Sequence, residues 1–144
     1  MIHLDTCFLV DLLREVGRDS HGSAFALLAR IQNEELGISV FVACELAAGA
    51  AMSKKSLQEK QRVDELCATL RVDYPDERFP GAYGSLLGSI ERSGGRVATM
   101  DLLIATSALL AGASLVTRNE KDFARIPGLR IQGYGSAASD RAVR

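Results

Sequence analysis

The stretch LGISVFVACELAAGA, residues 36–50, gives the clearest indication of the fold, because it joins a short apolar run to a longer segment of small and apolar residues. Its first part, LGISVF, is typical of a buried strand, and a helix is predicted to start near Val42. Between Leu36 and Ser53 the one charged residue is Glu45. A buried carboxylate is costly unless something is paired with it, so Glu45 calls for a partner.

The same alternation of strand and helix runs along the rest of the chain. The predicted strands are residues 1–5, 36–41, 71–75, 113–117 and 128–134. The predicted helices are residues 6–15, 23–35, 42–53, 57–70, 76–93, 100–112 and 118–126. Strands separated by helices indicate a parallel sheet covered on both faces. We therefore expect one α/β domain with three α/β/α layers and a central, mostly parallel sheet of about five strands.

Length and composition limit the organisation of the chain. At 144 residues and 47% hydrophobic, it suits a single core. We predict that residues 1–134 form the domain and that residues 135–144, which are small and polar, form a loosely ordered tail. Because the formal net charge is only -1, the surface is not strongly basic overall, and any contact with nucleic acid must come from a local basic patch. A basic signal segment is absent and no apolar run reaches the ~20 residues of a membrane span, so we expect a cytoplasmic protein.

Four acidic residues fall where predicted strands meet helices: Asp5, Glu45, Asp101 and Asp122. Ligands of open parallel sheets bind beyond the carboxyl ends of the strands. Taken singly, Glu45 and Asp101 are equally explained as acids near helix N-termini, and Asp122 as a surface residue. Together they would repel, by roughly 3 kcal/mol for a pair ~5 Å apart at an effective dielectric of about 20. Such a cluster needs a cation, and oxygen ligands favour Mg²⁺ or Mn²⁺.

Four segments together resemble a known family. They are LDTCFLVDLL (4–13), ISVFVACELAAGA (38–50), MDLLIATSALLAG (100–112) and LVTRNEKDFARIPGLRI (115–131). In order and spacing they resemble the PIN-domain ribonucleases, most closely the VapC toxins of type II toxin–antitoxin systems. The resemblance extends to about Tyr134. It implies that Asp5, Glu45 and Asp101 hold the metal, which would be the partner that Glu45 needs.

The chain departs from the family pattern at two positions. The first family block usually reads D-T-N or D-T-S, whereas this chain has Cys7 in third place, which removes a polar side chain that could orient Asp5 or a metal-bound water. The fourth family acid most often lies where this chain has Asn119. We assign the fourth catalytic acid to Asp122, three residues on, and expect Asn119 to contact a metal-bound water or a phosphate.

Further polar residues flank these positions. Thr6 and Thr117 match polar positions beside the site, although helix capping and strand packing explain them about as well. The nearest candidates for phosphate contacts are Arg118 and Lys121, together with Lys54 and Lys55 at the end of the helix that carries Glu45. Ordinary solubilising charge explains Lys54 and Lys55 at least as well.

The resemblance implies an endoribonuclease that uses Mg²⁺, with Mn²⁺ able to substitute, to hydrolyse RNA and inhibit translation or growth. A cognate VapB-like antitoxin would neutralise it, in a homodimer or a toxin–antitoxin hetero-oligomer that reaches DNA only through the antitoxin. An antitoxin helix would suit a groove on the early helices. Candidate groove residues, equally explained as core, are Leu9, Leu12, Leu13, Phe25 and Leu28. The alternative is a catalytically weak PIN-like scaffold that binds RNA or protein.

Overall fold

The computed structural model describes residues 1–135, which form five strands and seven helices. The strands are β1 (Ile2–Leu4), β2 (Leu36–Ser39), β3 (Arg71–Asp73), β4 (Ser114–Val116) and β5 (Ile131–Gln132). The helices are α1 (Thr6–Gly17), α2 (Ser23–Ile31), α3 (Val40–Met52), α4 (Ser56–Thr69), α5 (Phe79–Arg92), α6 (Thr99–Leu110) and α7 (Glu120–Phe123). The predicted tail, residues 135–144, lies outside the described residues apart from Gly135.

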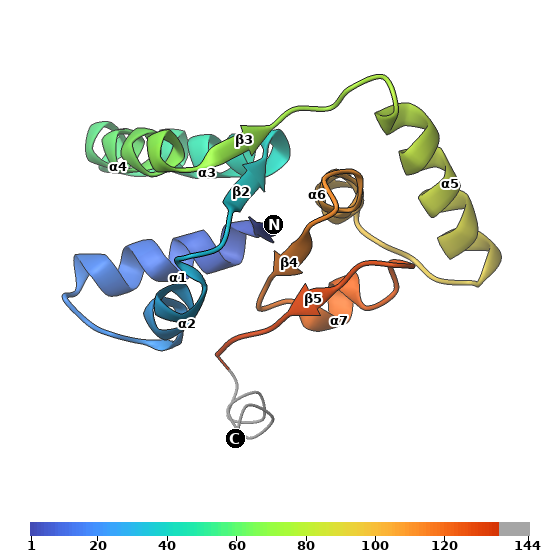
Figure 1. The fold of residues 1–144 in the computed structure, drawn as a ribbon. Helices are drawn as coiled ribbons and strands as arrows, with labels where there is room; N and C mark the ends of the chain where they lie inside the picture. The colour runs from blue at the N-terminus through green and yellow to red at the C-terminus, as the bar shows by residue number, and fades with distance from the viewer. Residues whose placement is uncertain (136–144) are drawn as a thin grey trace.

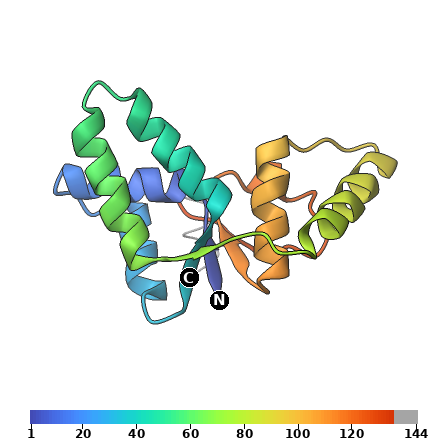
Figure 2. The ribbon, with the colours of Figure 1, turned by 90° about the horizontal axis from the view of Figure 1, so that it is seen from above.

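The sheet separates two layers of helices (Figure 1). Helices α1 to α4 lie on one side of it and α5 and α6 on the other, as the view from above also shows (Figure 2). The strand order is β3-β2-β1-β4-β5, and every pair is parallel. The predicted α/β/α architecture is confirmed. Because all five strands run in one direction, β1, β2 and β4 end at the same edge of the sheet.

The core lies on both faces of the central strands. Ile2 and Leu4 of β1 are 4% and 1% exposed, and Leu115 of β4 is fully buried. Phe8 and Leu9 in α1 are also fully buried, and each such side chain contributes about 1.5–3 kcal/mol by leaving water. Burial on both faces explains why these strands consist mostly of apolar residues in the sequence.

Side-chain capping fixes where the helices on the site side begin. Asp5 caps α1, since its Oδ1 accepts a hydrogen bond from the Thr6 amide at 2.8 Å. Ser39 caps α3, because its Oγ accepts a hydrogen bond from the Val42 amide at 3.2 Å. The helix therefore starts at Val40, so the prediction that residues 40 and 41 continue the strand is wrong. This early start places Glu45 in the second turn of α3.

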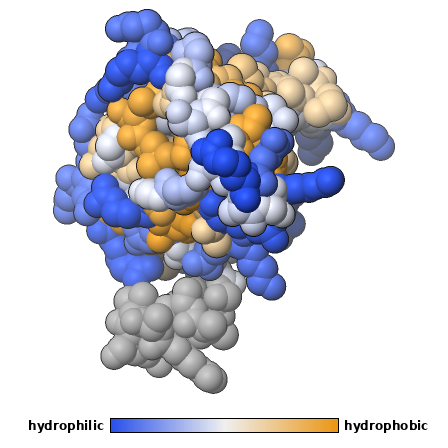
Figure 3. Space-filling view, turned by 90° about the vertical axis from the view of Figure 1, so that its right-hand side faces the viewer, coloured by the Kyte–Doolittle hydropathy of each residue, from blue (hydrophilic) through white to orange (hydrophobic). Residues whose placement is uncertain are grey.

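The side of the molecule that carries α5 shows hydrophobic side chains bordered by hydrophilic ones (Figure 3). The half-buried hydrophobic residues of α5 that pack on the core include Tyr83, Leu86 and Leu87. Among residues 1–135, no helix combines the length and hydrophobicity that crossing a bilayer requires.

Candidate active site

Asp5 is the most rigidly held acid at the carboxyl edge of the sheet. It directly follows β1, its amide donates a hydrogen bond to the Val116 carbonyl at 2.9 Å, and its side chain is 4% exposed. Its Oδ2 accepts a hydrogen bond from the Thr117 hydroxyl at 2.7 Å. The Asn119 amide in turn donates to Thr117 Oγ1 at 3.0 Å. The ends of β1 and β4 are thus tied together through one carboxylate.

Glu45 reaches the same edge from the other side of β1. Its Oε1 accepts a hydrogen bond from the Thr6 hydroxyl at 2.7 Å, which joins the first turn of α1 to α3. The contact places the Thr6 hydroxyl on one of the four acids. It also gives the half-buried Glu45 carboxylate one of the partners that the sequence called for, because a neutral hydroxyl donates to one of its oxygens.

Asp101 connects the four acids electrostatically. It lies in the first turn of α6 and is half-buried. Burial, followed by the negative charges of Asp5, Asp122 and Glu45, raises the pKa of Asp101 to about 6. A carboxyl group in the first turn of a helix is normally favoured in its charged form, and at Asp101 burial and the three negative neighbours outweigh that effect. The structure therefore brings together all four acids that the sequence singled out.

The donor set suits a hard cation. Among residues 1–135, no three or more His, Cys, Asp or Glu side chains are already arranged to enclose an ion. Mg²⁺, however, usually takes only one or two carboxylates and keeps several waters. Besides burial, the negative charges of the neighbouring acids raise the pKa of Asp101, and a bound cation would offset this repulsion. The oxygen donors of Asp5, Glu45 and Asp101 are of the chemical kind that such an ion binds.

Cys7 retains part of the orienting role that the sequence suggested was lost. Its Sγ donates to Asp5 Oδ2 at 3.4 Å, lies 3.5 Å from Thr117 Oγ1, and accepts a hydrogen bond from the Arg118 amide at 3.3 Å. Burial and then the charge of Asp5 raise the pKa of the Cys7 thiol. The thiol is thus held as a neutral, weak donor on the carboxylate that heads the site.

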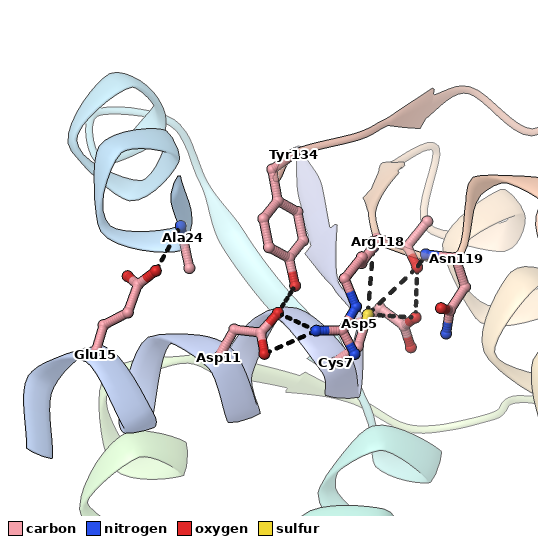
Figure 4. Close-up of polar contacts among 9 residues, drawn as sticks. Asp5, Cys7, Asp11, Glu15, Ala24, Arg118, Asn119 and Tyr134 are labelled. Carbon is pink, nitrogen blue, oxygen red and sulfur yellow. Dashed lines mark hydrogen bonds and ion pairs between the residues drawn. The ribbon is translucent and has the colours of Figure 1, made fainter. Parts of the chain in front are cut away.

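Arg118, expected to contact phosphate, is instead bound within the protein. Its guanidinium donates to both carboxylate oxygens of Asp11, at 3.0 and 2.8 Å (Figure 4). The Tyr134 hydroxyl donates to Asp11 Oδ2 at 2.7 Å, and burial and this hydrogen bond raise the pKa of Tyr134. The sequence analysis missed Asp11, although an acid within the apolar pattern of α1 was a visible signal.

Arginine and lysine side chains also lie beside Asp101 and Asp122. A depression of about 330 Å³ is lined by Arg96, Val97, Ala98, Asp101, Lys121, Asp122 and Arg125. It includes Lys121, for which the sequence predicts a phosphate contact, and two arginines that no motif identifies because they lie in connecting segments. Asp122 itself is exposed, so it borders this depression rather than lying inside the site.

An apolar groove opens on the other side, beside Glu45. Its volume is about 400 Å³. The lining residues are Val10, Leu13, Arg14, Glu45, Leu46, Gly49, Ala50, Ser53, Glu59, Arg62 and Val63. Of the hydrophobic residues expected in a groove on the early helices, Leu13 lines it, whereas Leu9 and Leu12 are 0% and 7% exposed and belong to the core. Phe25 and Leu28 pack against the core from α2.

Residues 2–129 match the PIN domain family. The chain is a PIN-domain protein. Ribonuclease VapC2 of Rickettsia felis is 34% identical over 116 residues, which cover 81% of this chain and 85% of the relative. Ribonuclease VapC1 of Haemophilus influenzae strain R2866 is 32% identical over 104 residues, covering 72% of this chain and 78% of the relative. Within the PIN-domain family, the chain belongs with the VapC ribonucleases.

Solved structures show the same similarity for this PIN domain. VapBC2 from Rickettsia felis, bound to a DNA fragment from the promoter, superimposes with a TM-score of 0.82 at 31% identity, covering 94% of this chain and all of the matched one. VapBC-1 from nontypeable Haemophilus influenzae gives a TM-score of 0.79 at 29% identity, covering 92% and 98%. The acids described above therefore occupy a PIN-domain sheet edge.

Proposed function

We propose that the protein is a VapC-type toxin that hydrolyses RNA phosphodiester bonds with the help of a divalent metal ion. The observation that carries the proposal is the group of four carboxylates at one sheet edge, where burial and then the charges of Asp5, Asp122 and Glu45 raise the pKa of Asp101 to about 6. Relatives named as VapC ribonucleases support the reaction class. A fold with no need for a cation would gain nothing from this repulsion.

Asp5, Glu45 and Asp101 would hold the ion, for which Mg²⁺ is the first candidate and Mn²⁺ the substitute. When bound, such an ion lowers the pKa of a coordinated water and offsets charge on the phosphoryl oxygens. Asp5 is held for this task by Thr117 and by the Thr6 amide.

The remaining polar residues would act around the scissile phosphate. Asp122, exposed beside Asp101, can accept a proton from the attacking water or position it. The Asn119 side chain is free to contact the phosphate, because its backbone amide makes the hydrogen bond to Thr117. Cleavage would leave a 5′-phosphate and a 3′-hydroxyl, as the family resemblance implies.

The apolar groove between α1, α3 and α4 suits an antitoxin helix. Leu13 and Leu46 line its apolar part, and Arg14 and Arg62 border it, so an amphipathic helix with acidic flanks would match it. Its lining includes Glu45, so an occupant would reach the edge of the active site. Related structures described as VapBC complexes, one of them with promoter DNA, support a VapB-like antitoxin as partner and as the DNA-binding subunit. The hydrophobic side of Figure 3 supports additional self-association.

RNA cleavage by the purified, antitoxin-free protein tests the proposal. Total RNA is incubated with Mg²⁺ or Mn²⁺, and the cut ends are mapped for wild type and Asp101→Asn. We expect discrete 5′-phosphate ends from wild type, none with a chelator, and none from the variant. If folded wild type and variant are equally inert at high metal concentration, the ribonuclease proposal falls and a non-cutting scaffold that binds RNA or protein replaces it.

A further inference from the structure

The depression beside the acids has a charge pattern that metal binding does not explain. Its volume is about 330 Å³, and its lining includes the cations Arg96, Lys121 and Arg125 together with the carboxylates of Asp101 and Asp122. A metal ion needs only the carboxylates. Cations at the rim of an anionic metal site would weaken metal binding unless they serve a second anion.

Separate chain segments supply the three cations. Arg96 precedes α6, Lys121 lies in α7, and Arg125 follows α7. Arg125 Nη1 donates to the Arg96 carbonyl at 3.3 Å, which holds the two segments together. Ala98, the N-cap of α6, gives no side-chain acceptor to the first amides of this twelve-residue helix, so the helix dipole adds to the positive potential there.

Arg96, Lys121 and Arg125 are available to a ligand. Within residues 1–135, Arg96, Lys121 and Arg125 make no ion pair, and all three are exposed. Arg118, on the opposite side of Asp5, is neutralised by Asp11 at 2.8 Å. Three cations that make no ion pair among the described residues therefore lie beside Asp101 and Asp122, on the α6–α7 side.

We propose that Arg96, Lys121 and Arg125 form a phosphate subsite that binds the RNA strand next to the bond being cut. The proposal rests on the ribonuclease function given above. A diester phosphate carries one negative charge, which exposed arginine and lysine bind mainly through electrostatic attraction and counterion release. A strand seated there would place the neighbouring phosphate at Asp101 and Asp122, and would leave the apolar groove beside Glu45 to the antitoxin.

The test measures single-stranded RNA binding without cleavage. A fluorescently labelled RNA is titrated in Mg²⁺ with Asp101→Asn protein, alone and combined with Arg96→Ala, Arg125→Ala or both. Each lost phosphate contact should weaken binding about fivefold at ~0.1 M salt and reduce the slope of log K against log salt by ~0.7. The double variant should lose about 25-fold.

The matched control is Lys54→Ala with Lys55→Ala, which removes the same charge. These lysines lie between α3 and α4, on the side of the sheet opposite the α5–α6 connection (Figure 2). Binding by this control should change less than twofold. Circular dichroism, measured on all variants, verifies that the fold is retained.

Several outcomes would overturn the subsite, and they differ from failure of the ribonuclease proposal. Unchanged RNA affinity in the arginine double variant, or an equal loss in the lysine control, removes the subsite even when wild type cuts RNA with mapped ends. If wild type fails to cut, but RNA binding still depends on Arg96 and Arg125, the subsite stands and the ribonuclease function falls. If wild type neither binds nor cuts RNA, both fall.

Discussion

Burial and the neighbouring acids disfavour the ionised form of Asp101 in the folded protein. Its pKa is raised to about 6 from an ordinary value of 3.8, so the folded protein favours the protonated carboxyl group more than the unfolded chain does. In the absence of metal, folding stability is therefore lost as pH rises from about 4 through about 6. Above that range the penalty is fully present, and a divalent cation should remove it.

The first prediction follows from this linkage. In chelator at pH 7.5, Asp101→Asn should melt at a higher temperature than wild type, by about 3 °C for each kcal/mol of relieved repulsion, and at pH 4 the two should coincide. Added Mg²⁺ should stabilise wild type more than the variant. Thermal unfolding followed by circular dichroism measures both effects, and equal melting temperatures at pH 7.5 would show that the acids do not repel in the folded protein.

The contact of Cys7 with Asp5 leads to a second prediction, which concerns metal affinity. Its thiol donates to Asp5 Oδ2 at 3.4 Å, and residues that orient a metal ligand commonly affect metal affinity about tenfold. Cys7→Ala should weaken Mn²⁺ binding by up to about tenfold, whereas Cys7→Ser, which restores a hydroxyl donor, should match or exceed wild type. Calorimetric titration with Mn²⁺ separates this role from plain packing, because a packing role would make serine at least as harmful as alanine.

At the scale of elements, α1, β4 and β5 are joined by one carboxylate. Asp11 of α1 binds Arg118, which follows β4, and Tyr134, which follows β5. Tyr134 also meets the buried Phe8 ring edge-on, with 5.1 Å between ring centroids. The C-terminal end of the described chain is therefore fastened to α1 by both a polar and an aromatic contact.

The third prediction tests this fastening. Asp11→Ala should destabilise the fold by about 1–3 kcal/mol, because it leaves the buried Tyr134 hydroxyl without its acceptor. Tyr134→Phe, which removes the donor and keeps the ring, should cost no more than about 1.5 kcal/mol. Urea unfolding measures both changes. A loss for Tyr134→Phe as large as that for Asp11→Ala would contradict the assignment of Asp11 as the shared acceptor.

The sequence predicted the elements better than their boundaries and contacts. Apolar runs and helical spacing identified every strand and helix, because burial on two faces or on one helical face leaves a periodic pattern. The start of α3 was misplaced, since it depends on a hydrogen bond from one amide to Ser39. The pairing of Arg118 with Asp11 joins residues 107 positions apart, and no local pattern encodes it.

On the scale of the whole molecule, the three acids matched to the family motif could be predicted, whereas the surfaces around them could not. Asp5 follows β1, Glu45 lies in the second turn of α3 and Asp101 in the first turn of α6, and the parallel topology brings these positions to one edge. Arg96 and Arg125 lie in connections whose course depends on packing. The result is an acidic centre between two different surfaces, a cationic depression on one side and an apolar groove on the other.

The fourth prediction separates these two surfaces. Leu13→Glu places a charge in the apolar groove and should abolish binding of the cognate antitoxin, or weaken it at least 100-fold, because a charge buried against apolar side chains costs several kcal/mol. RNA cleavage by the same variant should stay within about twofold of wild type.

The matched control is Leu57→Glu, since Leu57 is 85% exposed on α4 and does not line this groove. Cleavage assays with and without antitoxin measure both properties. If Leu13→Glu is still neutralised like wild type, the antitoxin docks elsewhere. If it loses cleavage as well while remaining folded, the groove and the active site are not independent surfaces.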